Sequence, residues 1–587
     1  MRFTRPLPLA WPAHIAYRTL ALLLVGALTA CTPSRPTPAT SAPASAASTS
    51  QAWVAAANPY AVEAGLEVLA KGGGAVDAAI AVQTVLGLVE PQSSGIGGGA
   101  FMLYYDASTR RIMAFNGRET APAGARADMF LDSNGEPLPR SVATMSGRAV
   151  GVPGVMRMLE LAHKQFGALP WSEAFEPAIR LAQDGFEVPK RLARFLNSGF
   201  PQANAPDIRK LFSRADGSPL QAGDHFRNPA YAETLRQLAS SGASVMYEGP
   251  LAEAIVARSR AEPLGGSMTL QDLAQYRPEQ SEPLCRTYRV RLVCVPPPPS
   301  SGVGLLQLLA LLEHTDAAEG GPQAPEAWFA FAQASRIMYA DRDRYVADPR
   351  FVPVPVEQLL DPEYVARRTK LIGERAGPAP QAGVLSVDMP GADATREAAG
   401  TSHFVIVDER GNVVSMTTTV ETLFGTGRVV GGFVLNNQLT DFSLNPREDG
   451  RLAANAVAGG KRPRSSMAPV IILDTDRAFF GALGSPGGNA ILAYNGKTLL
   501  GTLGWGLELQ QAIELPNLLA RGDNFGGEAS KFPPNVLEGL AARGITVTPG
   551  RGEESGLHGV MRNSAGLLVG GADPRREGVA RRLSESN

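Results

Sequence analysis

The sequence predicts a globular fold that contains both helices and strands. Hydrophobic residues make up 44% of the 587 residues and charged residues 19%, which supports a large core and excludes collagen, coiled coil and global disorder. Apolar residues recur at helical spacing in much of the chain up to about residue 350. From Thr401 onward the pattern changes to short runs rich in Val and Thr, which is typical of strands.

The charges exclude some classes of function. Lys and Arg number 55 against 56 Asp and Glu, a net charge of -1, whereas a general polyanion binder carries a basic excess. We therefore expect no nucleic acid partner. The three cysteines and six histidines lack zinc-ligand spacing, so we expect no metal and no cofactor.

The first 31 residues predict a signal peptide. Arginines precede the apolar run 20–28, which is too short for an ordinary membrane span. The segment 28–31, Leu-Thr-Ala-Cys, resembles a bacterial lipobox, so Cys31 is the expected lipidated residue. An ordinary signal peptide cleaved nearby is the alternative. We expect a periplasmic protein that touches a bacterial membrane only through this lipid anchor.

A tether and then a folded body follow. Residues 32–50 are almost entirely Ser, Thr, Pro and Ala and cannot bury enough apolar surface to fold. In the body, residues 60–71 have helical spacing and end in three glycines, and residues 76–89 are apolar on nearly all sides, which predicts a buried helix. Residues 101–105 predict a strand.

Later elements are assigned in the same way. Residues 150–350 predict mostly helix, and residues 375–400 lose apolar periodicity, which predicts an exposed, flexible loop. Further strands and one helix are expected at residues 403–407, 413–420, 470–473, 479–483 and from 489 onward, with a turn at 408–412.

Two cysteines remain if Cys31 carries a lipid. Cys285 and Cys294 flank residues 286–293, which alternate as a strand does. In an oxidising periplasm the two thiols could bridge a hairpin. Two unpaired, small hydrophobic side chains are the other interpretation, and the sequence leaves both open.

A hydrolase of this sequence would need an unusual nucleophile. The chain has no Gly-x-Ser-x-Gly elbow, and its cysteines lack a catalytic context. A threonine can serve if its own α-amine is the base, which requires a cut that makes it a chain start. Gly400 and Thr401, at the junction of loop and strand, offer such a pair, although the pair alone is unspecific.

The surrounding blocks make the signal specific. They occur in order at residues 90–99, 118–122, 297–302, 401–404, 424–427, 435–442, 461–467 and 572–576. Together they closely resemble the γ-glutamyltranspeptidase (γ-glutamyltransferase) family, over about residues 52–580. The resemblance implies the N-terminal nucleophile hydrolase fold, an α+β, four-layer αββα sandwich. It also implies a precursor that cuts itself between Gly400 and Thr401 into a large subunit, 51–400, and a small subunit, 401–587, which stay together.

The resemblance gives four residues catalytic roles. Thr401 Oγ would attack the γ-carbonyl of the donor, and its own α-amine, with an ordinary pKa of about 8, would take the proton. Thr419 matches a family threonine whose hydroxyl supports the nucleophile. The N–H groups of Gly487 and Gly488 would hold the oxyanion. Without the family, these would be an ordinary strand threonine and a strand-to-helix turn.

Six further residues would hold the glutamyl end of the substrate. Arg118 matches the family's carboxylate clamp. Hydroxyl donors would come from Ser465 and Ser466, and the ammonium would be bound by Glu421, Gln438 and Asp441. Taken one by one, these could be surface or loop residues. Two departures from the family matter: many members carry Asn at the position of Glu421, and the loop 442–464 is shorter than a full lid, which predicts an open site.

The resemblance implies a self-processing γ-glutamyltransferase and glutathione hydrolase. A γ-glutamyl ester on Thr401 would pass to water, or to an amino acid or peptide acceptor. One alternative is a glutaryl-type β-lactam acylase of the same fold, although Gln438 and Asp441 beside Arg118 favour a donor with an ammonium. Another is a non-catalytic lipoprotein that binds γ-glutamyl peptides. Fold alone does not decide among them.

Overall fold

The computed structural model describes residues 51–584, apart from 392, 394, 396, 398, 399, 449 and 550–554. The expected signal peptide, the lipobox at Cys31 and the tether at 32–50 lie outside the described residues. The sequence-based predictions for these segments therefore stay predictions.

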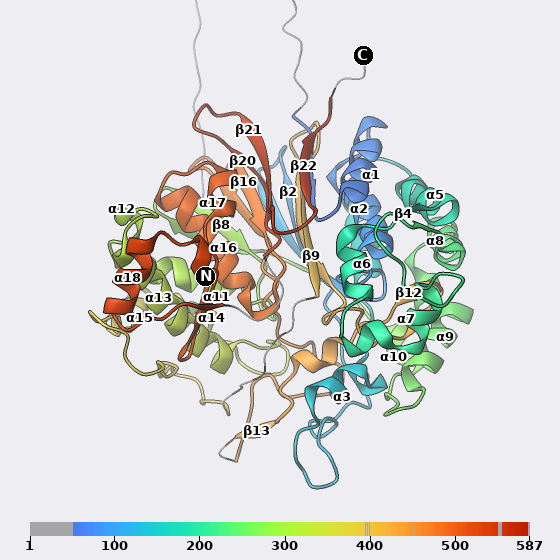
Figure 1. Cartoon of the computed structure of the whole chain (residues 1–587), viewed down its shortest axis with the longest axis horizontal. Coiled ribbons are helices and arrows are strands. Elements are labelled where there is room, and N and C mark those ends of the chain that lie inside the picture. The colour runs from blue at the N-terminus through green and yellow to red at the C-terminus, as the bar shows by residue number, and fades with distance from the viewer. Residues whose placement is uncertain are drawn as a thin grey trace, which may run out of the picture. The chain divides into compact units, whose positions relative to one another are not determined.

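Two antiparallel sheets face each other in the middle of the fold (Figure 1). The first has the order β22-β1-β9-β10-β2-β3-β6, and its strands span Val579–Arg582, Trp53–Ala56, Thr401–Val407, Val413–Thr419, Gly99–Asp106, Arg111–Asn116 and Glu279–Ser281. The second has the order β21-β20-β16-β15-β8-β7, and its strands span Leu568–Ala572, His558–Arg562, Phe479–Gly484, Val470–Leu473, Arg291–Val295 and Leu284–Tyr288.

Alternating side chains of each strand fill two different cores. In β9, Phe404 and Ile406 belong to the core between the first sheet and the helices that cover its outer face. Val405 and Val407 pack against the second sheet, where they meet residues such as Ile471. Burial on both faces favours apolar residues at successive positions of a strand, which is why 404–407 is a continuous hydrophobic run.

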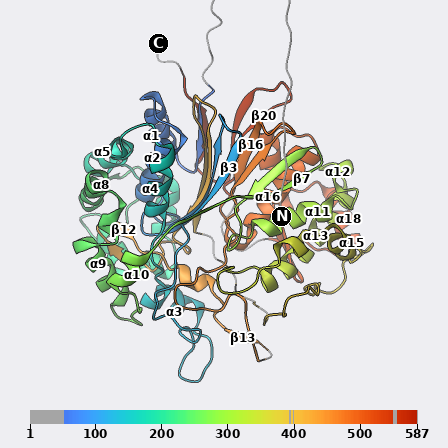
Figure 2. The ribbon, with the colours of Figure 1, turned by 180° about the vertical axis from the view of Figure 1, so that it is seen from behind.

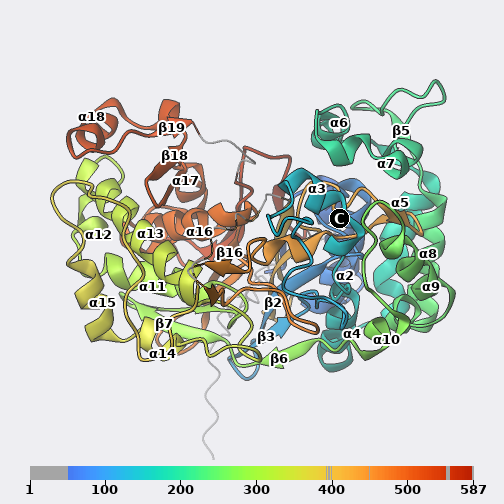
Figure 3. The same cartoon turned by 90° about the horizontal axis from the view of Figure 1, so that it is seen from below.

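Helices cover the outer face of each sheet, which gives four layers that are also visible from behind and from below (Figures 2 and 3). Beside the first sheet lie α1 (Pro59–Ala70), α2 (Ala75–Val89), α4 (Val155–Phe166), α5 (Glu176–Asp184), α6 (Lys190–Leu196), α8 (Pro229–Ser241) and α9 (Gly249–Arg260). Beside the second lie α11 (Gly302–Leu312), α13 (Pro325–Tyr345), α15 (Pro362–Thr369), α16 (Ile491–Leu499), α17 (Leu509–Glu514) and α18 (Pro534–Ala542). The α+β, αββα architecture expected from the sequence is confirmed.

Shorter elements connect these layers. The remaining α-helices are α3 (Arg140–Met145), α7 (Pro206–Leu211), α10 (Leu270–Gln275), α12 (Ala317–Gly320) and α14 (Val356–Leu359). The small strands are β4 (Phe186–Glu187), β5 (His225–Phe226), β11 (Val429–Val430), β12 (Phe433–Val434), β13 (Arg447–Glu448), β14 (Arg451–Leu452), β17 (Leu518–Arg521), β18 (Asn524–Gly527) and β19 (Thr548–Pro549).

Both sheets contain strands from before and after the Gly400–Thr401 bond. In the first sheet β9 pairs with β1 on one side and with β10 on the other, and β10 in turn pairs with β2. In the second sheet β15 pairs with β8. A cut at this bond would therefore leave two chains joined by sheet hydrogen bonds and by shared cores.

Most element predictions are confirmed, and two needed the structure. The predicted helices at 60–71 and 76–89 correspond to α1 and α2, and the strands of the last third to β9, β10, β15 and β16. Cys285 and Cys294 form a disulfide across β7 and β8, so the unpaired alternative is wrong. The predicted exposed loop at 375–400 is wrong at Asp393 and Glu397, each only 8% exposed, because buried arginines bind their carboxylates.

Candidate active site

A β-hairpin places the two predicted threonines opposite each other. Thr401 is the first residue of β9 and Thr419 the last of β10, and the antiparallel register pairs them directly. The turn between the strands is fixed by Asp408, whose Oδ1 accepts hydrogen bonds from the backbone N–H groups of Arg410 and Asn412, each at 2.9 Å. Turn chemistry and strand pattern thus set the distance between the threonines.

The Thr419 hydroxyl joins three groups around the bond that would be cut. It donates a hydrogen bond to the carbonyl oxygen of Gly400, at 2.5 Å. It accepts one from Thr401 Oγ at 3.3 Å and one from the backbone N–H of Glu421 at 2.8 Å. A hydroxyl in this position polarises the Gly400 carbonyl beside a potential nucleophile.

These threonines line a small cavity that gathers most of the predicted site. Of the ten catalytic and substrate-binding residues predicted, eight line it: Arg118, Thr401, Thr419, Glu421, Gln438, Asp441, Ser465 and Gly488. Glu397, Met467 and Ile491 complete the lining. Gly487 and Ser466 are each next in sequence to a lining residue. The parts come from β9, β10, the segment after β3, and the loops before β15 and α16.

Arg118 and Asp441 form a buried pair in this cavity. Arg118 Nη2 lies 2.6 Å from Asp441 Oδ2, which also accepts a hydrogen bond from Gln438 Nε2 at 2.7 Å. Arg118 Nη1 has no hydrogen-bond partner among the described residues, so it retains donors for a carboxylate. Burial raises the pKa of Asp441 above its ordinary value, against the effect of the Arg118 guanidinium. The cavity thus contains a guanidinium that could bind the carboxylate of an amino acid and a carboxyl group that could bind its ammonium.

The neighbouring Glu119 does not cancel the charge of Arg118. Its carboxyl group is fully buried, and the nearest cationic atom is Arg118 Nη1 at 3.9 Å. Burial raises the pKa of Glu119 to about 8, and the guanidinium opposes this only in part. Near neutral pH the Glu119 side chain is therefore mostly uncharged, and Arg118 remains a cationic group.

Glu421 lies at a sharp bend directly after Thr419 and Val420. Its φ of 78° is in the left-handed region, which non-glycine residues rarely adopt. Arg140 Nη2 lies 2.8 Å from Glu421 Oε1. A donor ammonium at this carboxylate would therefore share it with Arg140, a partner that sequence reasoning did not find.

The two predicted oxyanion glycines form the turn between β16 and α16. Gly487 has a φ of 136° and Gly488 one of 54°. A Cβ on Gly487 would lie 2.6 Å from the ring of Tyr494, so the site has room only for glycine. The turn leaves the backbone of Gly488 at the cavity.

Three further residues reach the site without having been predicted. Arg576 Nη1 donates a hydrogen bond to the carbonyl oxygen of Thr401, at 3.1 Å. Glu397 lines the cavity, and Arg342 of α13 binds its carboxylate. Arg576 lies in a block that was noticed but given no role. No sequence signal singles out Arg342, because α13 also buries the charged residues Arg336 and Asp341.

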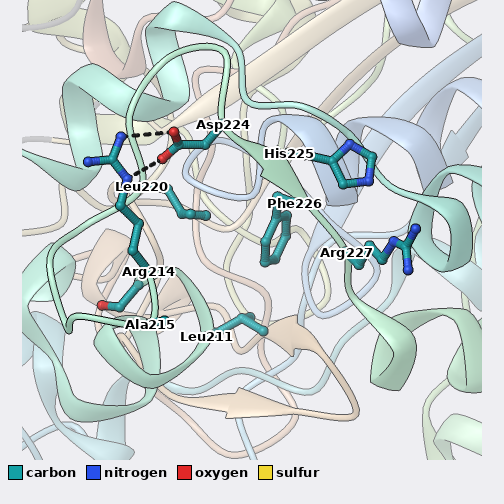
Figure 4. Close-up of a pocket in the computed structure, with 9 residues that line it drawn as sticks. Leu211, Arg214, Ala215, Leu220, Asp224, His225, Phe226 and Arg227 are labelled. Atoms are coloured by element: carbon teal, nitrogen blue, oxygen red, sulfur yellow. Dashed lines mark hydrogen bonds and ion pairs between the residues drawn. The ribbon is translucent and has the colours of Figure 1, made fainter.

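A second hollow of about 430 Å³ lies between α7 and β5 and shares no lining residue with the cavity at Thr401 (Figure 4). Arg214 and Asp224 form an ion pair at this hollow. Phe226 lies between that pair and His225 in the view of Figure 4. None of the predicted site residues lines this hollow. The candidate active site is therefore the smaller cavity.

The chain is similar to known proteins over most of its length. The sequence model of the family described as Gamma-glutamyltranspeptidase matches residues 61–583. The chain belongs to the γ-glutamyltranspeptidase family. It is 36% identical over 543 residues to a glutathione hydrolase proenzyme of Bacillus subtilis (strain 168), covering 90% of each chain. It is also 34% identical over 543 residues to an acylase ACY 1 proenzyme of Pseudomonas sp. (strain SE83), covering 91% of this chain and 94% of that one.

Solved structures of this family and its relatives share the fold. A cephalosporin acylase from Bacillus halodurans superposes with a TM-score of 0.81 at 28% identity, over 92% of this chain and 97% of that one. A Helicobacter pylori γ-glutamyltranspeptidase structure gives a TM-score of 0.51 at 33% identity, over 56% of this chain and 93% of that one. The relatives thus include both glutathione hydrolases and acylases, and the choice between these activities depends on the site.

Two structural features are absent from the described residues. Among them, no helix combines the length and the apolar character that crossing a membrane requires. The same residues contain no group of three or more His, Cys, Asp or Glu side chains arranged to hold a metal ion.

Proposed function

We propose that the protein is a self-processing γ-glutamyltransferase and glutathione hydrolase. One observation carries this proposal: the Thr419 hydroxyl bonds the Gly400 carbonyl while Thr401 Oγ stands beside it, in a cavity that also holds Arg118 and Asp441. Similarity to glutathione hydrolase proenzymes supports it. Self-cleavage would give a large subunit, 51–400, and a small subunit, 401–587.

Self-cleavage would use groups that are already in place. Thr401 Oγ attacks the Gly400 carbonyl carbon and its proton passes to the Thr401 nitrogen; the C–N bond then breaks, which leaves an ester of Gly400 on Thr401 and frees the α-amine. Water then hydrolyses this ester, which releases the Gly400 carboxylate and leaves Thr401 with a free hydroxyl and a free α-amine. Thr419 would stabilise the developing oxyanion in the first step.

The Thr401 hydroxyl that the cut leaves free would then attack the donor. The α-amine of Thr401 takes the proton while Oγ attacks the γ-carbonyl. It then gives this proton to the amide nitrogen, the C–N bond breaks, and an amine leaves, which gives a γ-glutamyl ester on Thr401. The N–H groups of Gly487 and Gly488 would hold the oxyanion. Water, an amino acid or a peptide then accepts the γ-glutamyl group.

Recognition of the glutamyl end would divide by charge. Arg118, Ser465 and Ser466 would bind the α-carboxylate, and Gln438, Asp441 and Glu421 the α-ammonium. A glutaryl side chain lacks the ammonium. The buried carboxylate of Asp441 therefore favours γ-glutamyl donors over the acyl groups of a β-lactam acylase.

A pair of anilide donors tests the function. The kcat/KM of the processed protein is compared for L-γ-glutamyl and glutaryl anilides, in the wild type and in Asp441→Asn. We expect the wild type to prefer the γ-glutamyl donor. In the variant, the ratio of kcat/KM for the γ-glutamyl anilide to kcat/KM for the glutaryl anilide should fall at least about tenfold, because a charge-assisted bond is lost. A wild-type preference for glutaryl would support an acylase, and no turnover of either anilide would support a binding protein.

The N-terminal address is a separate proposal. We propose that Cys31 carries a lipid that holds the protein to a bacterial membrane on the periplasmic side, through the tether at 32–50. Metabolic labelling with a fatty acid tests this in the wild type and in Cys31→Ala. Equal labelling of the two proteins, or none in either, would contradict it.

A further inference from the structure

The cavity at Thr401 contains a carboxylate from the chain itself. Glu397 precedes the Gly400–Thr401 bond by only three residues, and it lines the same cavity as Arg118, Ser465 and Thr401. The Glu397 side chain is nearly fully buried, although it lies in a segment with no apolar periodicity. Burial of a charged group at such a position needs specific partners.

Those partners form a complete carboxylate site. The backbone N–H of Ser466 donates a hydrogen bond to Glu397 Oε2, at 2.7 Å. Arg342 Nη2 binds Glu397 Oε1 and also donates to Ser466 Oγ, at 2.8 Å. Arg464 Nε lies 3.6 Å from Oε1. Two guanidinium groups and one backbone donor therefore meet at this carboxylate.

The arginines belong to the body of the fold and not to the segment before the cut. Arg342 is on α13, where Ser301 Oγ accepts from its Nε at 2.8 Å and Asp343 Oδ1 from its Nη1 at 2.9 Å. Arg464 is buried, and its Nη2 binds Asp393, 2.9 Å away. Burial opposes ionisation of Glu397, but the two arginines outweigh it and lower its pKa to about 2.

We propose that Glu397 occupies the subsite that receives the α-carboxylate of the γ-glutamyl donor, and that Arg342 is a further donor-binding group beside Ser466. This inference rests on the proposed function. Once the Gly400–Thr401 bond is cut, the segment that carries Glu397 has a free end and can leave. Its departure exposes the Arg342 guanidinium to a substrate carboxylate, with Arg118 in the same cavity. In the uncut chain Glu397 competes for the subsite, so the precursor binds a donor more weakly than it would without this side chain.

A donor without the α-carboxylate tests the role of Arg342. The processed Arg342→Lys enzyme is assayed with L-γ-glutamyl-p-nitroanilide and with 4-aminobutanoyl-p-nitroanilide, which keeps the ammonium and lacks the carboxylate. We expect kcat/KM for the first donor to fall about 10- to 100-fold, the range for losing a charge-assisted contact, and that for the second to stay within about twofold. A merely structural role would lower both alike.

Arg336→Lys is the matched control, because Arg336 is a buried arginine on the same helix whose bonds run to Gly522, Gly377 and Asp523. The ratio of its kcat/KM values for the two anilide donors should equal that of the wild type. If Arg342→Lys has an unchanged ratio while the wild type cleaves the γ-glutamyl donor, this inference is wrong and the proposed function stands. If the processed wild type cleaves no γ-glutamyl donor, the proposed function itself fails.

A second measurement does not depend on processing of the Arg342 variant. Binding of L-glutamate is measured by calorimetry to uncut Thr401→Ala and to uncut Thr401→Ala/Glu397→Ala. We expect at least about tenfold tighter binding to the double variant, because a competing group in the subsite reduces apparent affinity by the fraction of free sites. Thr401→Ala/Asp388→Asn, which changes an exposed carboxylate of the same segment, should bind as Thr401→Ala does. Equal affinity of all three proteins would overturn the proposal.

Discussion

Replacing Thr419 by Val removes the hydroxyl that bonds the Gly400 carbonyl and keeps the shape of the side chain. Thr419 is only 3% exposed, and its oxygen is 2.5 Å from the Gly400 oxygen, so no water replaces it without rearrangement. Loss of one oxyanion donor lowers a rate by about 10²- to 10³-fold, or about 2.7–4 kcal/mol of barrier. The Glu421 N–H also loses its acceptor, which costs about 1–3 kcal/mol of stability. We expect self-cleavage of Thr419→Val to slow about 10²- to 10³-fold.

The assay follows the uncut fraction over time by gel and intact mass. Thr419→Ser keeps the hydroxyl and should cleave within about tenfold of the wild type, since its loss is mainly a methyl group. Thr418→Val is the neighbouring control, because the Thr418 hydroxyl donates to Gly99 O, away from the bond to be cut. Cleavage of Thr419→Val at the wild-type rate would refute the role of this hydroxyl, as would a Thr418→Val variant that is equally slow.

Three further predictions follow from buried groups. Burial lowers the pKa of His558 to about 4 and that of His403 well below 6.5, so both stay neutral in the fold and the unfolded chain binds more protons as pH drops from 6.5 toward 4. Thermal unfolding should therefore show a falling midpoint over that range, and a constant midpoint between pH 7 and 5 would contradict this. Replacing Cys285 and Cys294 together by Ala should lower the free energy of unfolding by about 3 kcal/mol in urea titrations, from the short loop that the disulfide closes; an unchanged midpoint would argue against the bridge. Gly487→Ala should lower kcat for the γ-glutamyl anilide at least about tenfold, because its Cβ would meet Tyr494 and displace an oxyanion donor; wild-type kcat would remove this turn from the mechanism.

The strands and the turn of the hairpin could be predicted from local pattern, whereas the roles of Thr401 and Thr419 depend on the family resemblance. Residues 403–407 are mostly apolar, residues 413–420 are rich in Val and Thr, and both flank a turn sequence; the register that the structure gives this hairpin places Thr401 opposite Thr419. The buried helix at 76–89 was equally clear, because it is apolar on all sides. These features depend on neighbours within about 20 residues, which a sequence pattern reports directly.

The occupant of the cavity could not be predicted in this way. Residues 375–400 have no apolar periodicity, which ordinarily means solvent exposure. Glu397 is buried because Arg342, on a distant helix, supplies a charge partner. Likewise, Arg140 binds Glu421 although the two residues are 281 positions apart in the sequence. Contacts of this kind depend on the assembled fold and leave no periodic signal in either segment.

Intact mass spectrometry of the protein expressed from Gln51, beside a Thr401→Ala variant, tests the central claim most directly. The account predicts that the wild type separates into two chains under denaturing conditions, the smaller beginning at Thr401, and that the variant stays as one chain. The two wild-type chains should elute together under native conditions, since they share both sheets. A wild type that remains a single chain would contradict the self-processing nucleophile and the mechanism built on it.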